Sequence, residues 1–338
     1  MKKKMKHIIS GSLALLLIGS MLTGCGSNTA TNDKSKGNAS DKVYKIGISQ
    51  FIQHDALDSA YEGFVDGLKE AGYEDGVNIK FDYQNGQGDQ SNCSTIATKF
   101  VNDNVDLILA IGTPAAQAVA NATTDIPVLI TAITDPAYSK IVESNEAPGG
   151  NISGTSDLTP VKEQLELLVK MLPDAKKVAL LYSSAEANST IQINIAKKEA
   201  EELGLETIDA SVSNSNEIQQ VVQSLVGKVN AIYVPTDNMI ASGISTVTLV
   251  TEPNKIPVIC GEEGMVRSGG LATYGINYYN LGKQTAAQAV KILEGTATTD
   301  TMPIEYITKT NLVINKTVAD SLGITIPDDL LKEAELIE

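Results

Sequence analysis

The chain has 338 residues, with 41 acidic and 26 basic side chains and a formal net charge of −15. This acidity, with no basic patch beyond the first residues, argues against nucleic acids and other polyanions as partners. The length exceeds the usual size of one domain, so we expect two lobes, each with its own core.

The N-terminal segment has the layout of an export signal. Residues 1–7 carry four lysines, residues 8–22 form a short apolar run, and Leu-Thr-Gly precedes Cys25. The apolar run is shorter than the roughly 20 residues of a membrane-spanning helix. We therefore expect residues 1–24 to be a lipoprotein signal peptide, Cys25 to be lipidated, and residues 25–42 to be a flexible tether at the outer face of the cytoplasmic membrane.

Short apolar runs alternate with helical patterns from residue 45 onward, which is typical of βαβ units and parallel sheets. The predicted strands are residues 45–49, 78–83, 106–112 and 127–133 in the first half, and 177–182, 205–210, 230–234 and 257–260 in the second half. The two halves also repeat short motifs, since Ile-Pro-Val occurs at 126–128 and at 256–258. We therefore predict an α/β fold with two doubly wound parallel-sheet lobes in tandem.

The chain is expected to cross between the lobes several times. Residues 148–151 precede a first crossing, residues 271–277 resemble a second extended connector, and residues 311–314 form a final strand. These crossings would form a multi-strand hinge. The predicted first lobe is 43–155 plus 278–308, and the predicted second lobe is 156–277 plus 309–338. Cys93 and Cys260 would lie in different lobes as packing residues, without a disulfide.

Polar residues follow the carboxyl ends of the predicted strands, where open parallel sheets bind their ligands and the next helices present free N–H groups. Helix capping is the alternative explanation for each Ser, Thr, Asn and Asp at these places. The candidate ligand-binding residues are Gln50, Phe51, His54, Thr113, Thr134 and Asp135 in the first lobe, and Ser184, Glu186, Asn188, Asp237, Asn238 and Tyr274 in the second.

The residue types at these positions suit a zwitterion such as an amino acid. Arg267 is the only arginine, so an anionic group would have to rest on helix N termini and hydroxyl groups rather than on an arginine fork. The carboxylates of Asp135, Glu186 and Asp237 are able to hold a cation. The absence of tryptophan makes sugar binding less favoured.

Aromatic walls for an apolar side chain are available from Phe51, Tyr274 and Tyr278. The alternative is that each of these rings simply packs inside its own lobe.

Catalysis is poorly supported by the residues. His54 is the only histidine after the signal peptide, which excludes a multi-histidine zinc site, and it is equally suited to capping a helix. We find no G-x-S-x-G, Walker or G-x-G-x-x-G motif after a strand. We therefore predict a protein that is not an enzyme and has no metal or cofactor.

Four segments resemble a known family: residues 157–162 (DLTPVK), 186–189 (EANS), 233–238 (YVPTDN) and 271–275 (LATYG). They look like the substrate-binding lipoproteins of ABC importers in the tryptophan/tyrosine-binding group, over almost the whole mature chain. The resemblance implies a type I periplasmic-binding-protein fold and a ligand shell built from all the candidates above except Ser184 and Tyr274. Specificity in the first loop is expected to differ, since Gln53 stands where the family would have an acidic residue and Asp55 where it often has proline.

The implied function is capture of tyrosine or tryptophan between two closing lobes and delivery to an ABC permease with its ATPase. We expect a monomer in which Asp237 holds the ligand ammonium, Thr113 and nearby N–H groups hold the carboxylate, and Phe51 with Tyr274 flanks the ring. The alternatives are a surface adhesin, a ligand sensor, or a binder of another small molecule such as a nucleoside.

Overall fold

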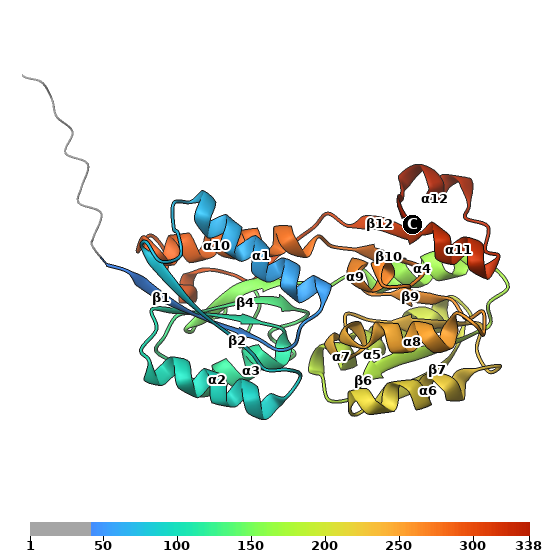
Figure 1. The fold of residues 1–338 in the computed structure, drawn as a ribbon, viewed down its shortest axis with the longest axis horizontal. Helices are drawn as coiled ribbons and strands as arrows, with labels where there is room; N and C mark the ends of the chain where they lie inside the picture. Colours follow the sequence, from blue (N-terminus) through green and yellow to red (C-terminus); the bar gives the residue numbers. More distant parts are fainter. Residues whose placement is uncertain (1–41) are drawn as a thin grey trace, which may run out of the picture. The chain divides into compact units, whose positions relative to one another are not determined.

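The computed structural model describes residues 42–338, which belong to one compact unit (Figure 1). The predicted signal peptide, Cys25 and the tether up to residue 41 lie outside the described residues. Within residues 42–338, no helix has the length and apolar character needed to cross a membrane.

The first lobe is built on a sheet of six parallel strands in the order β11-β5-β4-β3-β1-β2. Helices α1 and α10 cover one face, and α2 and α3 cover the other (Figure 1). β3 and β4 are buried along their whole length because helices cover both faces of the sheet. The bounds are β1 (Tyr44–Gln50), β2 (Ile79–Asn85), β3 (Leu107–Ile111), β4 (Val128–Ile133), β5 (Ile152–Ser156), β11 (Glu305–Tyr306), α1 (Asp55–Glu70), α2 (Gln90–Asn102), α3 (Thr113–Ala122) and α10 (Tyr278–Leu293).

The second lobe is built on a seven-stranded sheet in the order β13-β12-β10-β9-β8-β6-β7. Its helices again form two layers, with α4, α5, α11 and α12 on one face and α6 to α9 on the other. The strands are β6 (Lys177–Ser183), β7 (Glu206–Val212), β8 (Ala231–Val234), β9 (Val258–Cys260), β10 (Ala272–Gly275), β12 (Asn311–Asn315) and β13 (Glu335–Ile337). The helices are α4 (Val161–Met171), α5 (Ala187–Glu202), α6 (Ile218–Leu225), α7 (Asn238–Ser242), α8 (Ile244–Thr251), α9 (Glu263–Arg267), α11 (Lys316–Leu322) and α12 (Asp328–Glu333).

The predicted class of two parallel-sheet lobes is confirmed, with one departure from parallel pairing. β12 runs antiparallel to β10, because the chain leaves the second sheet after β10, forms α10 and β11 in the first lobe, and then returns. Residues 272–275, expected as part of an extended connector, form a paired strand of the second sheet. Cys93 in α2 and Cys260 in β9 are both buried, in different lobes.

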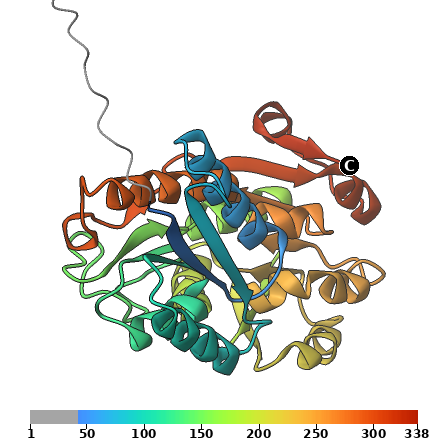
Figure 2. The same cartoon turned by 60° about the vertical axis from the view of Figure 1, so that its left-hand side comes forward.

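Helices α1 and α10 lie side by side at very close range (Figures 1 and 2). A Cβ atom added to Gly63 would lie 1.9 Å from the backbone oxygen of Tyr279, and one added to Gly282 would lie 2.0 Å from that of Ala60. Only glycine permits this approach. The contact fixes the chain that returns from the second lobe onto the first helix of the first lobe.

Replacement of Gly63 or Gly282 by alanine should lower the free energy of unfolding. Alanine in place of a helical glycine is usually stabilising by about 0.5–1 kcal/mol. Here the added methyl group meets backbone atoms, and such overpacking costs about 1–3 kcal/mol. Urea unfolding of Gly63→Ala and Gly282→Ala, with Gly150→Ala as the control, measures the effect. Gly150 has no atom within 4 Å of its added Cβ, so equal stability of all three variants would contradict the close packing.

Candidate functional site

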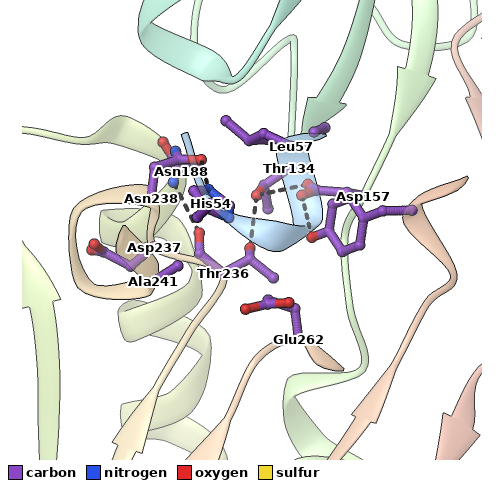
Figure 3. Close-up of a pocket in the computed structure, with 12 residues that line it drawn as sticks. His54, Leu57, Thr134, Asp157, Asn188, Thr236, Asp237, Asn238, Ala241 and Glu262 are labelled. Atoms are coloured by element: carbon purple, nitrogen blue, oxygen red, sulfur yellow. Dashed lines mark hydrogen bonds between the residues drawn. The ribbon is translucent and has the colours of Figure 1, made fainter. Parts of the chain in front are cut away.

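A small cavity lies where the carboxyl ends of strands from both sheets come together (Figure 3). Its lining residues lie at the carboxyl ends of β1, β4, β5, β6, β8, β9 and β10 or in the segments that follow these strands. The cavity has a volume of about 10 Å³, enough for about one water molecule. A larger molecule can enter only if the lobes separate or side chains move. The lining residues are His54, Leu57, Ala132, Thr134, Asp157, Asn188, Thr236, Asp237, Asn238, Ala241, Glu262 and Tyr278.

Hydrogen bonds join the two lobes across this cavity. His54 Nε2 lies 3.2 Å from Asn238 Oδ1, and the hydroxyl oxygens of Thr134 and Thr236 lie 3.3 Å apart. The Gln192 side chain donates to Thr236 Oγ1 at 2.7 Å and to Thr134 Oγ1 at 3.4 Å. The site is therefore held in a closed arrangement by polar side chains of opposite lobes.

Asp157 links the site to the crossings between the lobes. It follows β5, and its carboxylate accepts hydrogen bonds from the Thr134 hydroxyl at 3.1 Å and the Tyr278 hydroxyl at 2.7 Å. Tyr278 opens α10, directly after the second crossing. One buried carboxylate thus connects two crossings and one side of the cavity.

Asp237 and Glu186 form a buried acidic pair in the second lobe. Asp237 caps α7 by accepting from the N–H of Ile240 at 2.8 Å, and it also accepts from the N–H of Ser183 and the hydroxyl of Ser189. Glu186 accepts from the side-chain amides of Asn188 and Asn238 and from the backbone N–H groups of Asn238 and Met239. These bonds hold the start of α5 against the start of α7.

Glu262 is the third acidic residue of the second lobe at the site. It caps α9, accepting from the backbone N–H groups of Gly264 at 2.5 Å and Met265 at 2.8 Å. In the view of Figure 3, Glu262 and Leu57 lie on opposite sides of His54.

The four acidic groups are buried without a balancing positive charge. Asp157, Glu186, Asp237 and Glu262 have 1–4% of their surface exposed, and none forms an ion pair with a described residue. Burial raises the pKa of Asp157 to about 6 and that of Glu262 to about 7. Burial also raises the pKa values of Glu186 and Asp237, and for Glu186 the neighbouring Asp237 adds to the rise. Such a site favours a ligand that brings a cation.

Two acceptors at the cavity have no partner among the described residues. Asn238 donates through Nδ2 to Glu186, so its Oδ1 accepts and the His54 Nε2 carries the proton. Burial lowers the pKa of His54, so the ring is neutral near pH 7 and its Nδ1 is an unpaired acceptor. The Oδ1 of Asn188 is likewise unpaired. Both atoms need a donor, which an ammonium or hydroxyl group would provide.

The structure gathers part of the predicted ligand shell and leaves the rest outside the cavity. His54, Thr134, Asn188, Asp237 and Asn238 line the cavity, and Glu186 lies behind Asn238.

The other six candidates make contacts within their own lobes. In the first lobe, Gln50 donates to Asp58, Phe51 packs in the core, and Thr113 is buried at the start of α3. Asp135 accepts from the Tyr138 N–H and the Asn145 amide. In the second lobe, the Ser184 hydroxyl donates to the Val212 carbonyl, and Tyr274 packs against the core.

Tyr278, which the sequence offers as an aromatic wall, lines the cavity. Six further lining residues are outside the predicted candidates: Leu57, Ala132, Asp157, Thr236, Ala241 and Glu262. Thr236 and Glu262 each lie two residues after the end of a strand, β8 and β9, so their place in the sequence carries the same signal as that of the predicted candidates. Ala132 lies at a β-bulge with φ 57°, where one extra residue of β4 faces β5. A bulge of this kind has no signature in the local sequence.

The comparison with known proteins decides the family. Residues 45–337 match the pattern of ABC transporter substrate binding proteins. The chain belongs to this family. A relative from Clostridioides difficile (strain R20291), called a tyrosine-binding protein, is 44% identical over 321 residues, which are 94% of this chain and 93% of the relative. This substrate-binding protein therefore acts outside the cytoplasm with an ABC transporter.

Solved structures of similar proteins differ in how well they superpose on this substrate-binding protein. A conserved domain protein from Vibrio cholerae has a TM-score of 0.86 at 38% identity, covering 88% of this chain and 100% of that one. A complex with L-Trp from Streptococcus pneumonia has a TM-score of 0.85 at 41% identity, with the same coverage. A ligand-free, open substrate binding protein with adhesive properties from Clostridium difficile scores 0.67 at 43% identity, covering 88% and 99%. The described lobe arrangement is thus closer to the L-Trp complex than to the open structure.

The buried acids should make the ligand-free protein less stable as the pH rises. A carboxyl group whose pKa is raised on folding binds its proton more tightly in the folded state. The stabilising contribution of Glu262 to the free energy of unfolding is therefore fully present below pH 4.5 and is lost as the pH rises to about 7. The loss is on the order of 3 kcal/mol for this residue. Chemical unfolding between pH 4.5 and 8 measures it.

Glu262→Gln should flatten this profile, because the amide does not titrate. Glu252 is exposed at the end of α8, so Glu252→Gln is the matched control and should keep the wild-type profile. A Glu262→Gln profile that runs parallel to that of the wild type would contradict the raised pKa.

Proposed function

We propose that the protein captures an aromatic amino acid, tyrosine or tryptophan, in the cavity between its lobes and delivers it to the membrane permease of an ABC importer. The observation that carries this proposal is the set of buried carboxyl groups with no cation beside them, together with the unpaired acceptors on His54 and Asn188. An ammonium group satisfies both. The 44% identical tyrosine-binding protein and the L-Trp complex support the aromatic class.

The rest of the cavity suits the other parts of such a ligand. Leu57, Ala132, Ala241 and the ring of Tyr278 provide an apolar side, and the two alanines leave room for a ring once the lobes adjust. The N-cap residue of α5, Glu186, makes no side-chain hydrogen bond to this helix, and no acidic residue lies in the first turn. A ligand carboxylate is favoured there by the free N–H groups.

Capture works by closure in this proposal. The present cavity of about 10 Å³ is far smaller than typical ligand pockets of roughly 300–1,000 Å³. The ligand therefore enters an open form, and it shifts the population toward the closed form because it touches both lobes there. His54, Thr134, Asn188, Asp237 and Asn238 make up the ligand shell together with the lining residues named above.

Calorimetry and thermal unfolding with L-tyrosine, L-tryptophan and L-phenylalanine test the ligand class, with adenosine and myo-inositol as comparison compounds. A bound amino acid should stabilise the protein by about 2.7 kcal/mol at a hundredfold excess over its dissociation constant. Stabilisation by adenosine or myo-inositol alone would overturn the proposal.

Filling the cavity should weaken binding. Ala241→Leu places a larger side chain on the lining, and we expect at least a tenfold loss of affinity, about 1.4 kcal/mol. The next residue of α7, Ser242, is exposed, so Ser242→Leu is the matched control and should bind like the wild type. Equal affinities of the two variants would contradict this location of the site.

We further propose that the mature protein is a monomer held at the outer face of the membrane by lipid on Cys25. Cys25→Ala should move the protein from the membrane fraction to the medium, because two acyl chains give stable anchorage and the polypeptide alone does not. Fractionation with immunoblotting measures the distribution. Wild-type and variant proteins in the same fraction would contradict the lipid anchor.

Adhesion to host material is a second candidate, favoured by the adhesive properties stated for the Clostridium difficile structure. An adhesin would use the outer surface of the lobes. Host binding that is unchanged in Ala241→Leu would favour it.

A further inference from the structure

Glu262 differs from the other acids of the site in how its carboxyl group is used. It lines the cavity with 2% of its surface exposed, and each of its oxygens accepts one backbone N–H from α9. A carboxylate oxygen has two acceptor positions, so each oxygen of Glu262 keeps one position free. In the neutral form, the carboxyl proton has to occupy one of these free positions. A cation that binds Glu262 from the cavity therefore competes with this proton.

The other three carboxyl groups are less suited to this exchange. Asp237 accepts from three donors of its own lobe, and Glu186 accepts from four and does not line the cavity. Asp157 accepts only from hydroxyl groups, those of Thr134 and Tyr278. A hydroxyl group can turn and accept a proton instead, so Asp157 accommodates its neutral form without a ligand.

The groups around Glu262 provide no positive charge. Its titratable neighbours include Asp55 of α1, Glu263 of α9, Tyr278 of α10 and Cys260 of β9, and Asp55 and Glu263 both oppose ionisation of Glu262. The other titratable groups that line the same cavity are His54, Asp157 and Asp237, and none of them carries a positive charge near pH 7.

Arg267 is the cation nearest in sequence to Glu262. It forms ion pairs with Glu263 and Glu335. The free carboxyl group of Glu262 is therefore partly protonated near pH 7, with a pKa of about 7.

A second acceptor lines the same cavity. Asn188 has 2% of its surface exposed, and its Oδ1 has no partner among the described residues. An ammonium group has three N–H donors, so two remain for other acceptors when one binds a free position of Glu262.

Building on the proposed function, we propose that Glu262 is the acceptor for the ligand's ammonium group and that it gives up its proton when the ligand binds. The O–H bond of the neutral carboxyl breaks, the proton passes to the buffer, and the ammonium keeps its own three protons. Binding is then tighter at higher pH, over the range in which the ligand's amine stays protonated. The reason is that Glu262 is protonated in a smaller fraction of the protein molecules, so fewer of them have to lose a proton to bind.

Isothermal titration with L-tyrosine in two buffers of different ionisation enthalpy, phosphate and Tris, measures the protons released. At pH 7 we expect roughly half a proton per ligand, since the pKa of Glu262 is about 7. The number should be larger at pH 6.5 than at pH 8. The deaminated probe 3-(4-hydroxyphenyl)propionate should release no proton from the wild-type protein.

Glu262→Gln should remove the proton release and lower the affinity for L-tyrosine at least tenfold, since a charge-assisted hydrogen bond is lost. Its affinity for the deaminated probe should stay within about threefold of the wild-type value, which a merely structural role of Glu262 would not produce. Glu252→Gln is the matched control and should keep the wild-type proton number.

The outcomes separate this inference from the proposed function. Binding of L-tyrosine with equal enthalpies in both buffers would overturn the proton exchange and leave the proposed function standing. Equal losses of affinity for L-tyrosine and the deaminated probe in Glu262→Gln would overturn the ammonium role. If L-tyrosine, L-tryptophan and L-phenylalanine all fail to bind, both proposals fail. The wild-type measurements decide the question even if the variant does not fold.

Discussion

The burial of carboxyl groups without a counter-charge is the constraint on which the site depends. Two parallel sheets face each other with their carboxyl ends, and the helices that follow start with acidic caps, as Asp237 does for α7 and Glu262 for α9. Each cap is favourable for its own helix. Closing the lobes removes these carboxyl groups from water, which costs desolvation free energy. A cationic group on the proposed ligand would offset this cost.

The same closure depends on close helix packing in the first lobe. The glycines at the contact of α1 and α10 bring the start of α1, with His54 and Leu57, and the start of α10, with Tyr278, to one edge of the sheet. A residue from the beginning of the first lobe and one from its last helix thus line the same cavity. The core sets the geometry of the site before any ligand contact is made.

Sequence periodicity was sufficient for the architecture, because buried parallel strands and the helices between them leave a strong pattern. It also placed His54, Thr134 and Asn238 near the site, since residues after strands gather at one edge. It did not determine which way a side chain points. Phe51 follows β1 and Tyr274 lies in β10, yet Phe51 is buried in one core and Tyr274 packs half-buried against another, because burial of a ring is favourable. The bulge at Ala132 and the approach of Tyr278 from α10 depend on tertiary contacts that no local pattern encodes.

The antiparallel pair of β10 and β12 has a mechanical consequence. Gly275 at the end of β10 faces Asn311 at the start of β12, so two of the three chain crossings leave the second sheet from one hydrogen-bonded point. The bond between Asp157 and Tyr278 ties the remaining crossing to them. The three crossings are therefore held together at one place, and any relative movement of the lobes has to bend the chain there.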